Sequence, residues 1–455
     1  MSRHVPALVV GGGISGLVCA YALRKSGIDA HLIEASSRPG GPIHSLLRDG
    51  FLLELGPQSF SSAPVLMDLC HELGLDNQIL PAPRAPRFVL LDGALRPAPL
   101  SPPAFFASSF FGLKTKWSVI RDVFGHSAPP AEEESVADFV QRKLTPEMLE
   151  KLVGPFVSGI YAGDPERLSL PAAFPQLYDA ESQAGSIVRG MVRLGKQIKQ
   201  TGRPRRTVFT FRDGNEILVH TLAAKIGPAL RTNVRATRIT RREDASFEVH
   251  LESDGQVEAV STKALILATP TDVTGKLLAG LDDSIEPLLK RVEYAPVAVV
   301  SLGYQRSEIR HSLNGFGFLA PRSAGLRVLG TVWNSSLFPG RAPDGHVLMT
   351  SFVGGVSDPT AVELSPAELA NLVHNQISPL LSASGSPAFS NVTVWPRAIP
   401  QYNLGHLDRL TAVTKLLQNC PGIWLTGNYL RGPAVGSCVE QANAVAEEVH
   451  KALQS

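Results

Sequence analysis

A run of glycines close to the start of the chain has the composition and spacing of a loop that binds phosphates. Residues 11–16 are Gly-Gly-Gly-Ile-Ser-Gly and fit the pattern G-x-G-x-x-G. In such a loop the first glycine permits a tight turn, the second lets the backbone approach a pyrophosphate, and the third lets a helix pack on a sheet. The phosphates then lie at the helix N-terminus, where free N–H groups and the helix dipole favour anions. We therefore expect a dinucleotide to contact Gly11, Gly12, Gly13, Ile14, Ser15 and Gly16.

An acidic residue and a second glycine pair follow this loop at a distance that narrows the choice of cofactor. Glu34 ends the next expected strand, where a carboxylate can bond the ribose hydroxyls of a dinucleotide. The spacing Glu-x-x-x-Arg-x-Gly-Gly from Glu34 to Gly41 resembles the signature of flavin amine oxidases and their relatives, which implies FAD. Pro42 stands where that family has a basic residue, and an ordinary polar loop is the alternative interpretation. The resemblance implies that the cradle continues through Glu34, Ala35, Arg38, Gly41 and Pro42.

The elements that must hold these loops form a βαβ unit. Residues 4–10 are an apolar strand, 14–25 show a helical pattern that Gly27 ends, and 30–34 are the next strand. Further strands are expected over 247–251, 264–268, 297–302, 347–352, 391–394 and 423–426, and further helices over 64–73, 216–226 and 435–453. Residues 80–103 are rich in proline and are expected to be irregular, and 202–206 to cross between domains. This order predicts an α/β protein with a second sheet.

The composition argues against several classes of protein. Hydrophobic residues make up 44% of the 455 residues, so the chain can bury a large core. Lys plus Arg number 43 and Asp plus Glu 41, and this balance argues against a nucleic-acid binder. The four cysteines lie far apart and form no CxxC pair, so we expect neither a metal site nor a disulfide scaffold.

Two uncharged runs have the length of membrane or targeting segments. The first, 5–23, contains the glycine loop, and we interpret it as a strand turning into a helix. The second, 97–113, contains four prolines, which forbid a regular spanning helix of that length. Because almost nothing precedes the first strand, we expect no organelle transit peptide and a bacterial-type cytoplasmic location.

Five later segments, in order along the chain, resemble the protoporphyrinogen oxidase family. They are ELGPQSF at 54–60, GIYAGD at 159–164, GFGFLAP at 315–321, IPQYNLGH at 399–406 and GNYLRG at 427–432, the last followed by CVE at 438–440. The segment at 399–406 is the most specific. Pro433 departs from the family, in which an apolar Val is expected at this position.

The resemblance implies a fold and a reaction. The fold is α/β, with a Rossmann-like FAD-binding domain, a mixed-sheet substrate domain and a helical membrane-docking insertion, as in amine oxidases and p-hydroxybenzoate hydroxylase. These parts would comprise, in turn, 1–80 with 204–272 and 420–455; 81–99 with 273–419; and 100–203. The reaction is the oxygen-dependent, six-electron oxidation of protoporphyrinogen IX to protoporphyrin IX in haem biosynthesis, with hydride transfer to N5 of FAD and release of three H2O2.

The same resemblance assigns roles to residues beyond the glycine loops. One FAD per chain, held noncovalently, would also contact Gly56, Pro57, Gln58, Ser59, Val234, Trp395, Gly427, Asn428, Pro433, Ala434 and Val435. The macrocycle would occupy an apolar slot formed by Gly159, Leu319, Val332 and Phe352, with Arg87 binding a propionate. Cys438 should lie inside the closing helix and form no tether to the flavin. No protein residue is expected to act as a catalytic base, because the cofactor carries the chemistry.

Several alternatives stay open at this point. The nearest is a coproporphyrinogen III oxidase, whose substrate has four propionates instead of two. Amine oxidases, carotenoid desaturases and non-catalytic carriers with a flavin fold are more distant. His406 is expected to be structural rather than catalytic. Phe105, Phe106, Phe110 and Phe111 either pack in a core or form an apolar face that docks on a membrane surface, which in a bacterium would be the inner membrane. The sequence leaves open whether the protein is a homodimer.

Overall fold

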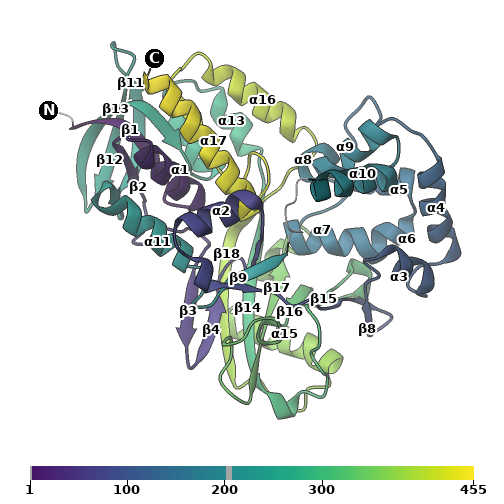
Figure 1. Ribbon diagram of the computed structural model, residues 1–455. Coiled ribbons are helices and arrows are strands. Elements are labelled where there is room, and N and C mark those ends of the chain that lie inside the picture. Colours follow the sequence, from purple (N-terminus) through teal and green to yellow (C-terminus); the bar gives the residue numbers. More distant parts are fainter. Residues whose placement is uncertain (1–2, 201–206, 455) are drawn as a thin grey trace.

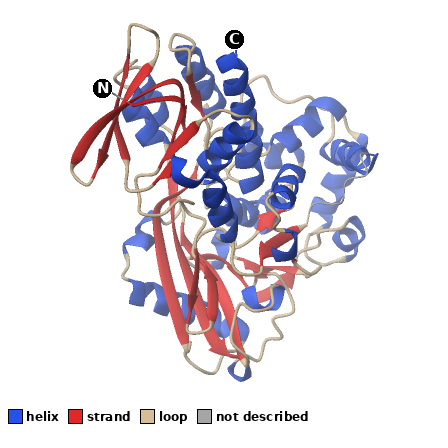
Figure 2. Ribbon diagram, turned by 60° about the vertical axis from the view of Figure 1, so that its left-hand side comes forward, coloured by secondary structure: helices blue, strands red, loops and turns tan. Residues whose placement is uncertain are grey.

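The computed structural model describes residues 3–200 and 207–454. Figure 1 shows three parts: a sheet with helices near the two chain ends, a second sheet below it, and a lobe of helices beside both. After a turn about the vertical axis the strands still form two separate sets, with helices packed beside them (Figure 2). The expected crossing at 202–206 lies outside the described residues. Within the described ranges, none of the helices combines the length and the apolar composition that a membrane span requires.

The first sheet carries the glycine loop. Its strands have the order β10-β2-β1-β13-β12-β11, and β19 pairs with β13. β10, β2, β1, β13 and β19 are parallel, whereas β11 and β12 extend the sheet in antiparallel fashion. The bounds are Arg3–Val10 (β1), Ala30–Ile33 (β2), Leu230–Arg231 (β10), Arg235–Arg241 (β11), Phe247–Ser253 (β12), Gln256–Leu267 (β13) and Ile423–Leu425 (β19). The expected βαβ unit is therefore present.

Helices cover both faces of this sheet, as the continuous apolar sequence of β1 requires. Successive side chains of a strand point to opposite faces; Ala7 and Val9 belong to one buried core, and Leu8 and Val10 to another. One face is covered by α1 (Ile14–Lys25), α2 (Pro64–Glu72), α11 (Ile217–Ile226) and α17 (Val435–Gln454). The other is covered by α12 (Thr271–Leu278), α13 (Ile285–Lys290) and α16 (His406–Leu417).

The packing of α12, α13 and α16 changes the domain limits that we would draw. These helices lie largely within 273–419, which we assigned to the substrate domain, yet Leu277, Leu289 and Val413 are buried in a core of the first sheet. An amphipathic helix shows its apolar stripe in sequence, but not which sheet receives it. We therefore propose that the second stretch of the substrate domain runs from about Tyr294 to about Pro400.

The second sheet has the strand order β18-β14-β17-β16-β15-β7-β8. Neighbours are antiparallel except β15 and β7, which are parallel, so the sheet is mixed as expected. The bounds are Arg87–Leu91 (β7), Ala94–Pro97 (β8), Tyr294–Gln305 (β14), Gly317–Leu319 (β15), Val328–Val332 (β16), His346–Gly354 (β17) and Phe389–Pro400 (β18). Helix α15 (Pro366–Leu381) packs on one face and leaves the other toward the lobe and the segment 51–55.

The hairpin of β7 and β8 corrects our expectation that 80–103 is irregular. Leu91 pairs with Ala94, so two residues form the turn. These residues, Asp92 and Gly93, have φ values of 51° and 73°, and an Asp-Gly turn of this kind is favoured in hairpins. The prolines of the segment lie at or beyond the strand ends, where they interrupt no central pairing.

Shorter elements join the two sheets. The hairpin of β3 (Ser45–Arg48) and β4 (Phe51–Glu54) packs Phe51 and Leu53 against Leu348 and Phe389 of the second sheet. β5 (Phe60–Ser61), β6 (Ile79–Pro81) and β9 (Val208–Phe211) form a small third sheet in the order β5-β9-β6. Helix α14 (Asn334–Leu337) follows β16. The segment between β4 and β5 thus runs along the boundary of the two large sheets.

The lobe consists of short helices between residues 102 and 200. They are α3 (Pro102–Ala107), α4 (Leu113–Phe124), α5 (Val136–Lys143), α6 (Pro146–Met148), α7 (Gly154–Tyr161), α8 (Leu170–Ala173), α9 (Pro175–Ala184) and α10 (Ile187–Gln200). Buried ion pairs hold them together, since Lys143 contacts Asp122 and Arg142 contacts Glu181, both at 2.8 Å. Breaking such a pair leaves an uncompensated buried charge, so these contacts fix α4, α5 and α9 to one another.

Candidate functional site

Backbone contacts shape the glycine loop after β1. Gly11 has a φ of +107° and donates its N–H to the Ile33 carbonyl at 2.9 Å. A Cβ on Gly16 would lie 1.9 Å from the Gly11 carbonyl oxygen, so a larger residue would force α1 away from β1. A Cβ on Gly12 would lie 2.9 Å from the Cβ of Glu34. Packing within the protein therefore requires all three glycines.

Gly13 differs, because its backbone is unstrained and its surroundings are open. It caps the N-terminus of α1 with a φ of −67°, and a Cβ there would meet no atom within 4 Å. A Cβ on Gly41 would have only the Gly13 Cα near it, at 3.8 Å. The two glycines border the same space, into which the first N–H groups of α1 and its dipole favour an anion. The residues present therefore fit the pyrophosphate of a dinucleotide, with Ile14 and Ser15 in the first helical turn.

Glu34 lies just beyond β2, and its carboxylate forms a hydrogen bond with the glycine loop. Its carboxylate accepts the Gly12 N–H at 2.6 Å and the Ser36 N–H at 2.8 Å. The Glu34 carbonyl accepts the Val234 N–H at 2.9 Å. Val234 therefore lies beside Glu34, but its N–H is engaged, so the backbone contact to the cofactor that we expected of Val234 would fall to its carbonyl oxygen. Ala35 lies exposed in the bend after Glu34.

Arg38 shapes the second glycine loop through its carbonyl groups. The guanidinium donates to the Gly41 carbonyl at 2.6 Å and to the Pro39 carbonyl at 3.1 Å. The Gly40 N–H donates to the Gly12 carbonyl at 2.7 Å and so fastens the second loop to the first. We expected Arg38 to form part of the cradle for the pyrophosphate and flavin, and these bonds show that it holds the cradle in shape.

The segment between β4 and β5 joins that cradle to the second sheet. A Cβ on Gly56 would lie 2.0 Å from the Pro42 carbonyl oxygen, so the two loops are in tight contact. The buried Gln58 side chain donates to the Glu54 carbonyl at 2.7 Å and accepts from the Asn334 amide at 2.8 Å. Asn215 donates to the Pro57 carbonyl at 2.9 Å, and Ser59 leads into β5. Gln58 is therefore committed to protein partners.

A buried ion pair that the sequence did not indicate lies at the same boundary. Arg341, which follows α14, contacts Glu54 at 2.9 Å, and both side chains are about 2% exposed. Burial raises the pKa of Glu54 to about 7, although Arg341 and the N–H of Asn215 favour its charged form. Arg341 also donates to the Phe211 carbonyl at 2.9 Å. The pair joins β4, β9 and the second sheet, and its partners are so far apart in sequence that no local pattern could reveal it.

The pairing of the strands places the expected substrate residues on one face of the second sheet. Arg87 of β7 and Val332 of β16 both pair with Gly317 of β15. Residues that pair directly share a face, and so do residues two apart on one strand. Leu319, two residues from Gly317, therefore joins Arg87 and Val332.

The same face continues across β17 to β18. Leu319 and Phe352 both pair with Gly330, and Phe352 also pairs with Val299. The neighbour of Val299 on this face, two residues along β14, pairs with Trp395. The Trp395 indole donates to the Leu55 carbonyl at 2.7 Å. One mostly apolar face thus extends from Arg87 at one end to the 54–60 segment at the other.

Helix α7 covers part of this face. A Cβ on Gly159 would lie 2.6 Å from a methyl carbon of Leu319. Gly159 and Leu319 therefore face each other from opposite elements, as expected of two walls of a slot. They are in direct contact, however, so the slot that we expected between them is closed at this point.

Arg87 lies at the exposed start of β7. Its guanidinium carbon is 4.8 Å from the centre of the Phe316 ring, a cation–π contact. Among the described residues no carboxylate forms an ion pair with it. Three other arginines on adjoining segments do have carboxylate partners: Arg167 pairs with Glu293, Arg322 with Asp164, and Arg397 with Asp272.

The last helix begins beside the first. Pro433 and Ala434 immediately precede α17, and Val435 is its first residue. Cys438 is 3% exposed within α17 and its thiol lies near the Ser15 side chain, so the first turns of α1 and α17 are neighbours. Burial raises the pKa of Cys438 to about 11. The thiol is therefore protonated at neutral pH and is a poor nucleophile toward a flavin.

His406 is fully buried and holds a backbone group. Its Nε2 lies 2.9 Å from the Tyr429 carbonyl oxygen. Because a carbonyl oxygen only accepts hydrogen bonds, Nε2 must carry a proton and donate it. Burial lowers its pKa to about 4, so the imidazole is neutral at physiological pH. Both features agree with the structural role that we expected. Gly427 and Asn428 lie in the loop that His406 supports, and Gly427 has a φ of +154°.

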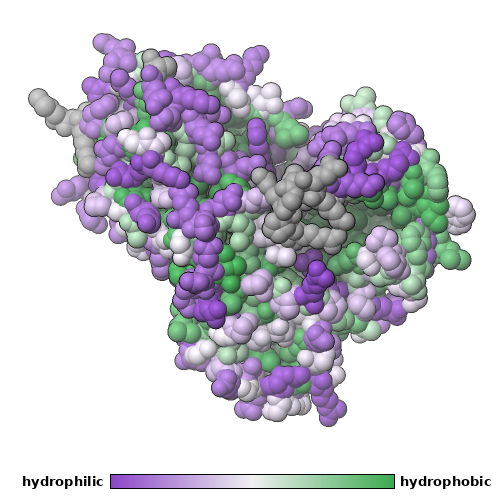
Figure 3. Space-filling view, in the orientation of Figure 1, coloured by the Kyte–Doolittle hydropathy of each residue, from purple (hydrophilic) through white to green (hydrophobic). Residues whose placement is uncertain are grey.

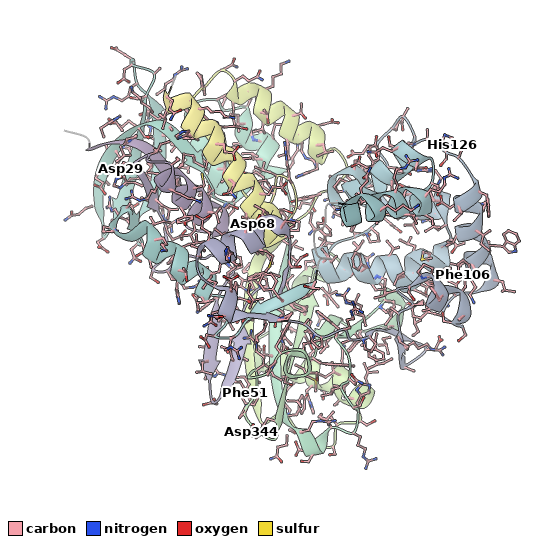
Figure 4. All side chains as sticks on the ribbon, in the orientation of Figure 1. Asp29, Phe51, Asp68, Phe106, His126 and Asp344 are labelled. Atoms are coloured by element: carbon pink, nitrogen blue, oxygen red, sulfur yellow. The ribbon has the colours of Figure 1, made fainter. Side chains whose placement is uncertain are left out.

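The phenylalanine cluster of the lobe is only partly exposed. Phe110 and Phe111 are 4% and 3% exposed and belong to the core of the lobe, so they cannot form the docking face that we considered. Phe105 is half-buried, and Phe106, labelled in Figure 4, is exposed. Apolar colour nevertheless gathers on the outer side of the lobe (Figure 3). There α4 exposes Leu113, Trp117 and Phe124, whose spacing of four and seven residues places them on one side of a helix.

Comparison with known proteins identifies the class to which this geometry belongs. Residues 14–450 match the family described as flavin containing amine oxidoreductase. A chloroplastic protoporphyrinogen oxidase from Nicotiana tabacum is 35% identical over 98% of this chain and 86% of its own length. A coproporphyrinogen III oxidase from Bacillus subtilis is 28% identical over 98% of this chain and 97% of its own. A solved structure described as a putative protoporphyrinogen oxidase from Exiguobacterium superposes with a TM-score of 0.82, 25% identity and 99% coverage of both chains.

The chain therefore belongs to the flavin containing amine oxidoreductases and, within them, to the protoporphyrinogen oxidase family. The resemblance seen in the five sequence segments is confirmed, and so is the α/β fold with an FAD-binding type of sheet. A flavin is the cofactor that this family uses.

Proposed function

We propose that the protein holds one FAD noncovalently and oxidises protoporphyrinogen IX to protoporphyrin IX, with molecular oxygen as the final electron acceptor. The observation that carries the proposal is the single face of the second sheet. It presents an apolar surface with an arginine at one end, and Trp395 bonds it to the 54–60 segment of the flavin cradle.

The residues that would hold FAD are those that border or brace the cradle. The N-termini of α1 and α17 would meet the pyrophosphate and the flavin ring respectively, and Glu34 the ribose. When bound, FAD supplies a position, N5, that accepts hydride from carbon. The protein itself would position the substrate. Val332 and Phe352 would lie against the flat macrocycle, and Arg87 would bond a propionate and so fix the rotation of the macrocycle.

Two propionates suit this site better than four. A charged group that leaves water needs a partner, and of the arginines on the strands of the second sheet Arg87 is the one that lacks a carboxylate partner among the described residues, since Arg96 pairs with Asp92. Arg322 and Arg397 already have such partners. The higher identity to the tobacco protoporphyrinogen oxidase than to the Bacillus coproporphyrinogen III oxidase points the same way.

An assay with both substrates tests the proposal. Purified protein should be yellow, and in air it should convert protoporphyrinogen IX to a fluorescent porphyrin at a higher kcat/KM than coproporphyrinogen III. A preference for coproporphyrinogen III would support the alternative function. A flavin-loaded protein inactive on both would overturn an oxidase role for this site.

The exposed side of α4 is the surface that we propose to dock on a membrane. Leu113, Trp117 and Phe124 can enter the headgroup region while Lys114 and Arg121 meet anionic lipid. An apolar substrate could then reach the protein from the bilayer surface. This proposal replaces the surface of four phenylalanines.

A further inference from the structure

The segment 399–406 has a position that the function proposed above does not use. Tyr402 is 1% exposed, and its ring stacks on that of His406 with a centroid distance of 4.5 Å and an angle of 13°. The Tyr402 hydroxyl donates to the Asn428 carbonyl and accepts the Gly432 N–H at 2.7 Å. With the His406 bond to Tyr429, two stacked rings hold three backbone groups of the loop between β19 and α17.

Besides these bonds, the buried Tyr429 side chain anchors the loop in a core of the first sheet. Gly427 and Gly432 have φ values of +154° and +124°, which side chains other than glycine rarely adopt. Within the loop, Leu430 donates its N–H to the Gly427 carbonyl at 3.3 Å. The loop runs directly into the first turn of α17. The geometry of that turn therefore depends on bonds that side chains of 399–406 provide.

The other side of the same segment is bonded to the lobe. The N–H of Ser169 donates to the Tyr402 carbonyl at 2.8 Å, and the N–H of Leu404 donates to the Arg167 carbonyl at 3.0 Å. Glu133 accepts from the Gly405 N–H and the Ser169 hydroxyl, both at 2.5 Å.

Two further contacts extend this connection. Gln401 donates to the carbonyl of Tyr161, the last residue of α7, at 2.8 Å. Its N–H donates to the carbonyl of Glu293, whose carboxylate pairs with Arg167 at 2.7 Å. A continuous set of hydrogen bonds therefore runs from the lobe to the loop before α17.

We infer that Tyr402 is a positioning residue that couples the helical lobe to the flavin end of α17. The inference rests on the proposed binding of FAD at the first turn of α17. A shift of the lobe against 399–406 would move the Tyr402 hydroxyl and, with it, the carbonyl and N–H groups that set the loop. Binding of a substrate to the face beside the lobe would in this way shift the loop before α17 and change the contacts to the cofactor.

Tyr402→Phe tests the link to the cofactor, because it keeps the stacked ring and removes both hydroxyl bonds. We expect the Kd for FAD, measured by titration of flavin-free protein, to rise about tenfold, which corresponds to about 1.4 kcal/mol. The visible circular dichroism of the bound flavin should change as well. Tyr304→Phe is the matched control, because Tyr304 is also buried and its hydroxyl bonds His374 at 3.0 Å on the far face of the second sheet. It should lower Tm but leave the Kd for FAD unchanged.

Glu133→Ala tests the link to the lobe from the surface, and Glu132→Ala is its neighbouring control. We expect Glu133→Ala to raise the Kd for FAD about threefold and Glu132→Ala to leave it unchanged. Combined with Tyr402→Phe, Glu133→Ala should add nothing further, because its effect acts through the same segment. Independent, multiplying effects would overturn the coupling, and so would an unchanged Kd in Tyr402→Phe. If Tyr402→Phe does not fold, an unchanged Kd in Glu133→Ala alone overturns it. Failure of the wild-type protein to bind FAD would instead reject the proposed function.

Discussion

The dinucleotide cradle and the helical lobe are fixed by different kinds of contact. In the cradle, backbone groups bond one another directly, as when the Gly40 N–H meets the Gly12 carbonyl at 2.7 Å. In the lobe, buried charged side chains of different helices meet, as when Asp122 contacts Lys143. A backbone constraint limits the residue type at each position, whereas a packed core accepts many residues of similar size. The difference explains why a general steric motif marks the cradle, whereas the lobe was marked only by the family resemblance of the segment 159–164.

The largest effects should come from one substitution placed at two glycines of the cradle. Gly16→Val should prevent folding of the first sheet, because even a Cβ would lie 1.9 Å from the Gly11 carbonyl oxygen. Gly13→Val should fold normally, since its φ of −67° suits any residue and no atom lies within 4 Å of its Cβ. Its side chain would occupy the pyrophosphate space, so the Kd for FAD should rise more than about 100-fold, or about 2.7 kcal/mol.

Circular dichroism and Tm, followed by flavin titration, separate the two outcomes. Gly13→Ala should give a smaller loss of affinity than Gly13→Val. A Gly13→Val protein purified with full flavin content would show that the open space at α1 is not the pyrophosphate site.

The two glycines show which roles can be predicted from the sequence alone, namely those that follow from steric rules about the backbone. The pattern G-x-G-x-x-G assigned Gly11, Gly13 and Gly16 their roles because each role is a steric rule about the backbone. The residues of the substrate face were named by resemblance, and only the strand register shows that Arg87 and Phe352 share a face. Glu54 and Arg341 could not have been paired, because they are 287 residues apart and meet through the fold alone.

In the lobe, the sequence did not indicate which apolar residues are buried and which are exposed. Four phenylalanines at 105–111 suggested one apolar surface, yet two of them are buried, and the most exposed large apolar side chains among the described residues of the lobe lie on α4. Hydrophobic residues in a short stretch can face a core or solvent, and neither composition nor spacing decides between these when the neighbouring helices are unknown. The Asp-Gly turn of β7 and β8 is different, because its local signal was present and the surrounding prolines obscured it.

The next largest effect concerns Arg87, on the face that lies between cradle and lobe. Arg87→Ala should lower kcat/KM for protoporphyrinogen IX about tenfold to 100-fold, since a hydrogen bond to a charged group contributes about 1.5–3 kcal/mol. The lower part of this range applies if the exposed position stays hydrated. Steady-state kinetics with porphyrin fluorescence measures the change.

Flavin content and Tm of Arg87→Ala should match the wild type, because Arg87 is remote from the cradle. Arg87→Lys should recover part of the activity, as a point charge lacks the planar fork of a guanidinium. Unchanged kcat/KM in Arg87→Ala would place the propionate elsewhere.

A smaller effect is expected from the outer side of the lobe, where an exposed and a buried set of apolar residues can be compared. Replacing Leu113, Trp117 and Phe124 together by Ser should weaken binding to vesicles with anionic lipid about tenfold, because these exposed side chains would leave the headgroup region. Tm should hardly change. Replacing Phe110 and Phe111 by Ser should instead destabilise the fold by several kcal/mol, since large-to-small changes in a core cost about 3–5 kcal/mol each.

Vesicle flotation and thermal unfolding distinguish these two responses. Equal flotation of the wild type and the α4 variant would reject α4 as the docking surface. Loss of flotation in the Phe110 and Phe111 variant at temperatures where it remains folded would restore the surface that we first considered.

The smallest effect should come from Cys438, where the cradle meets the last helix. Its thiol lies near Ser15, and burial raises its pKa to about 11. A thiol that stays protonated cannot attack the flavin, and a buried position inside α17 gives it no path to do so. Cys438→Ala should therefore bind FAD with the wild-type Kd and lose at most about 1 kcal/mol of stability from the small cavity. Acid denaturation should release all flavin from both proteins into the supernatant. Flavin that remains on the precipitated wild-type chain but not on Cys438→Ala would show a covalent bond, and it would require α17 to open at the turn that now closes the cradle.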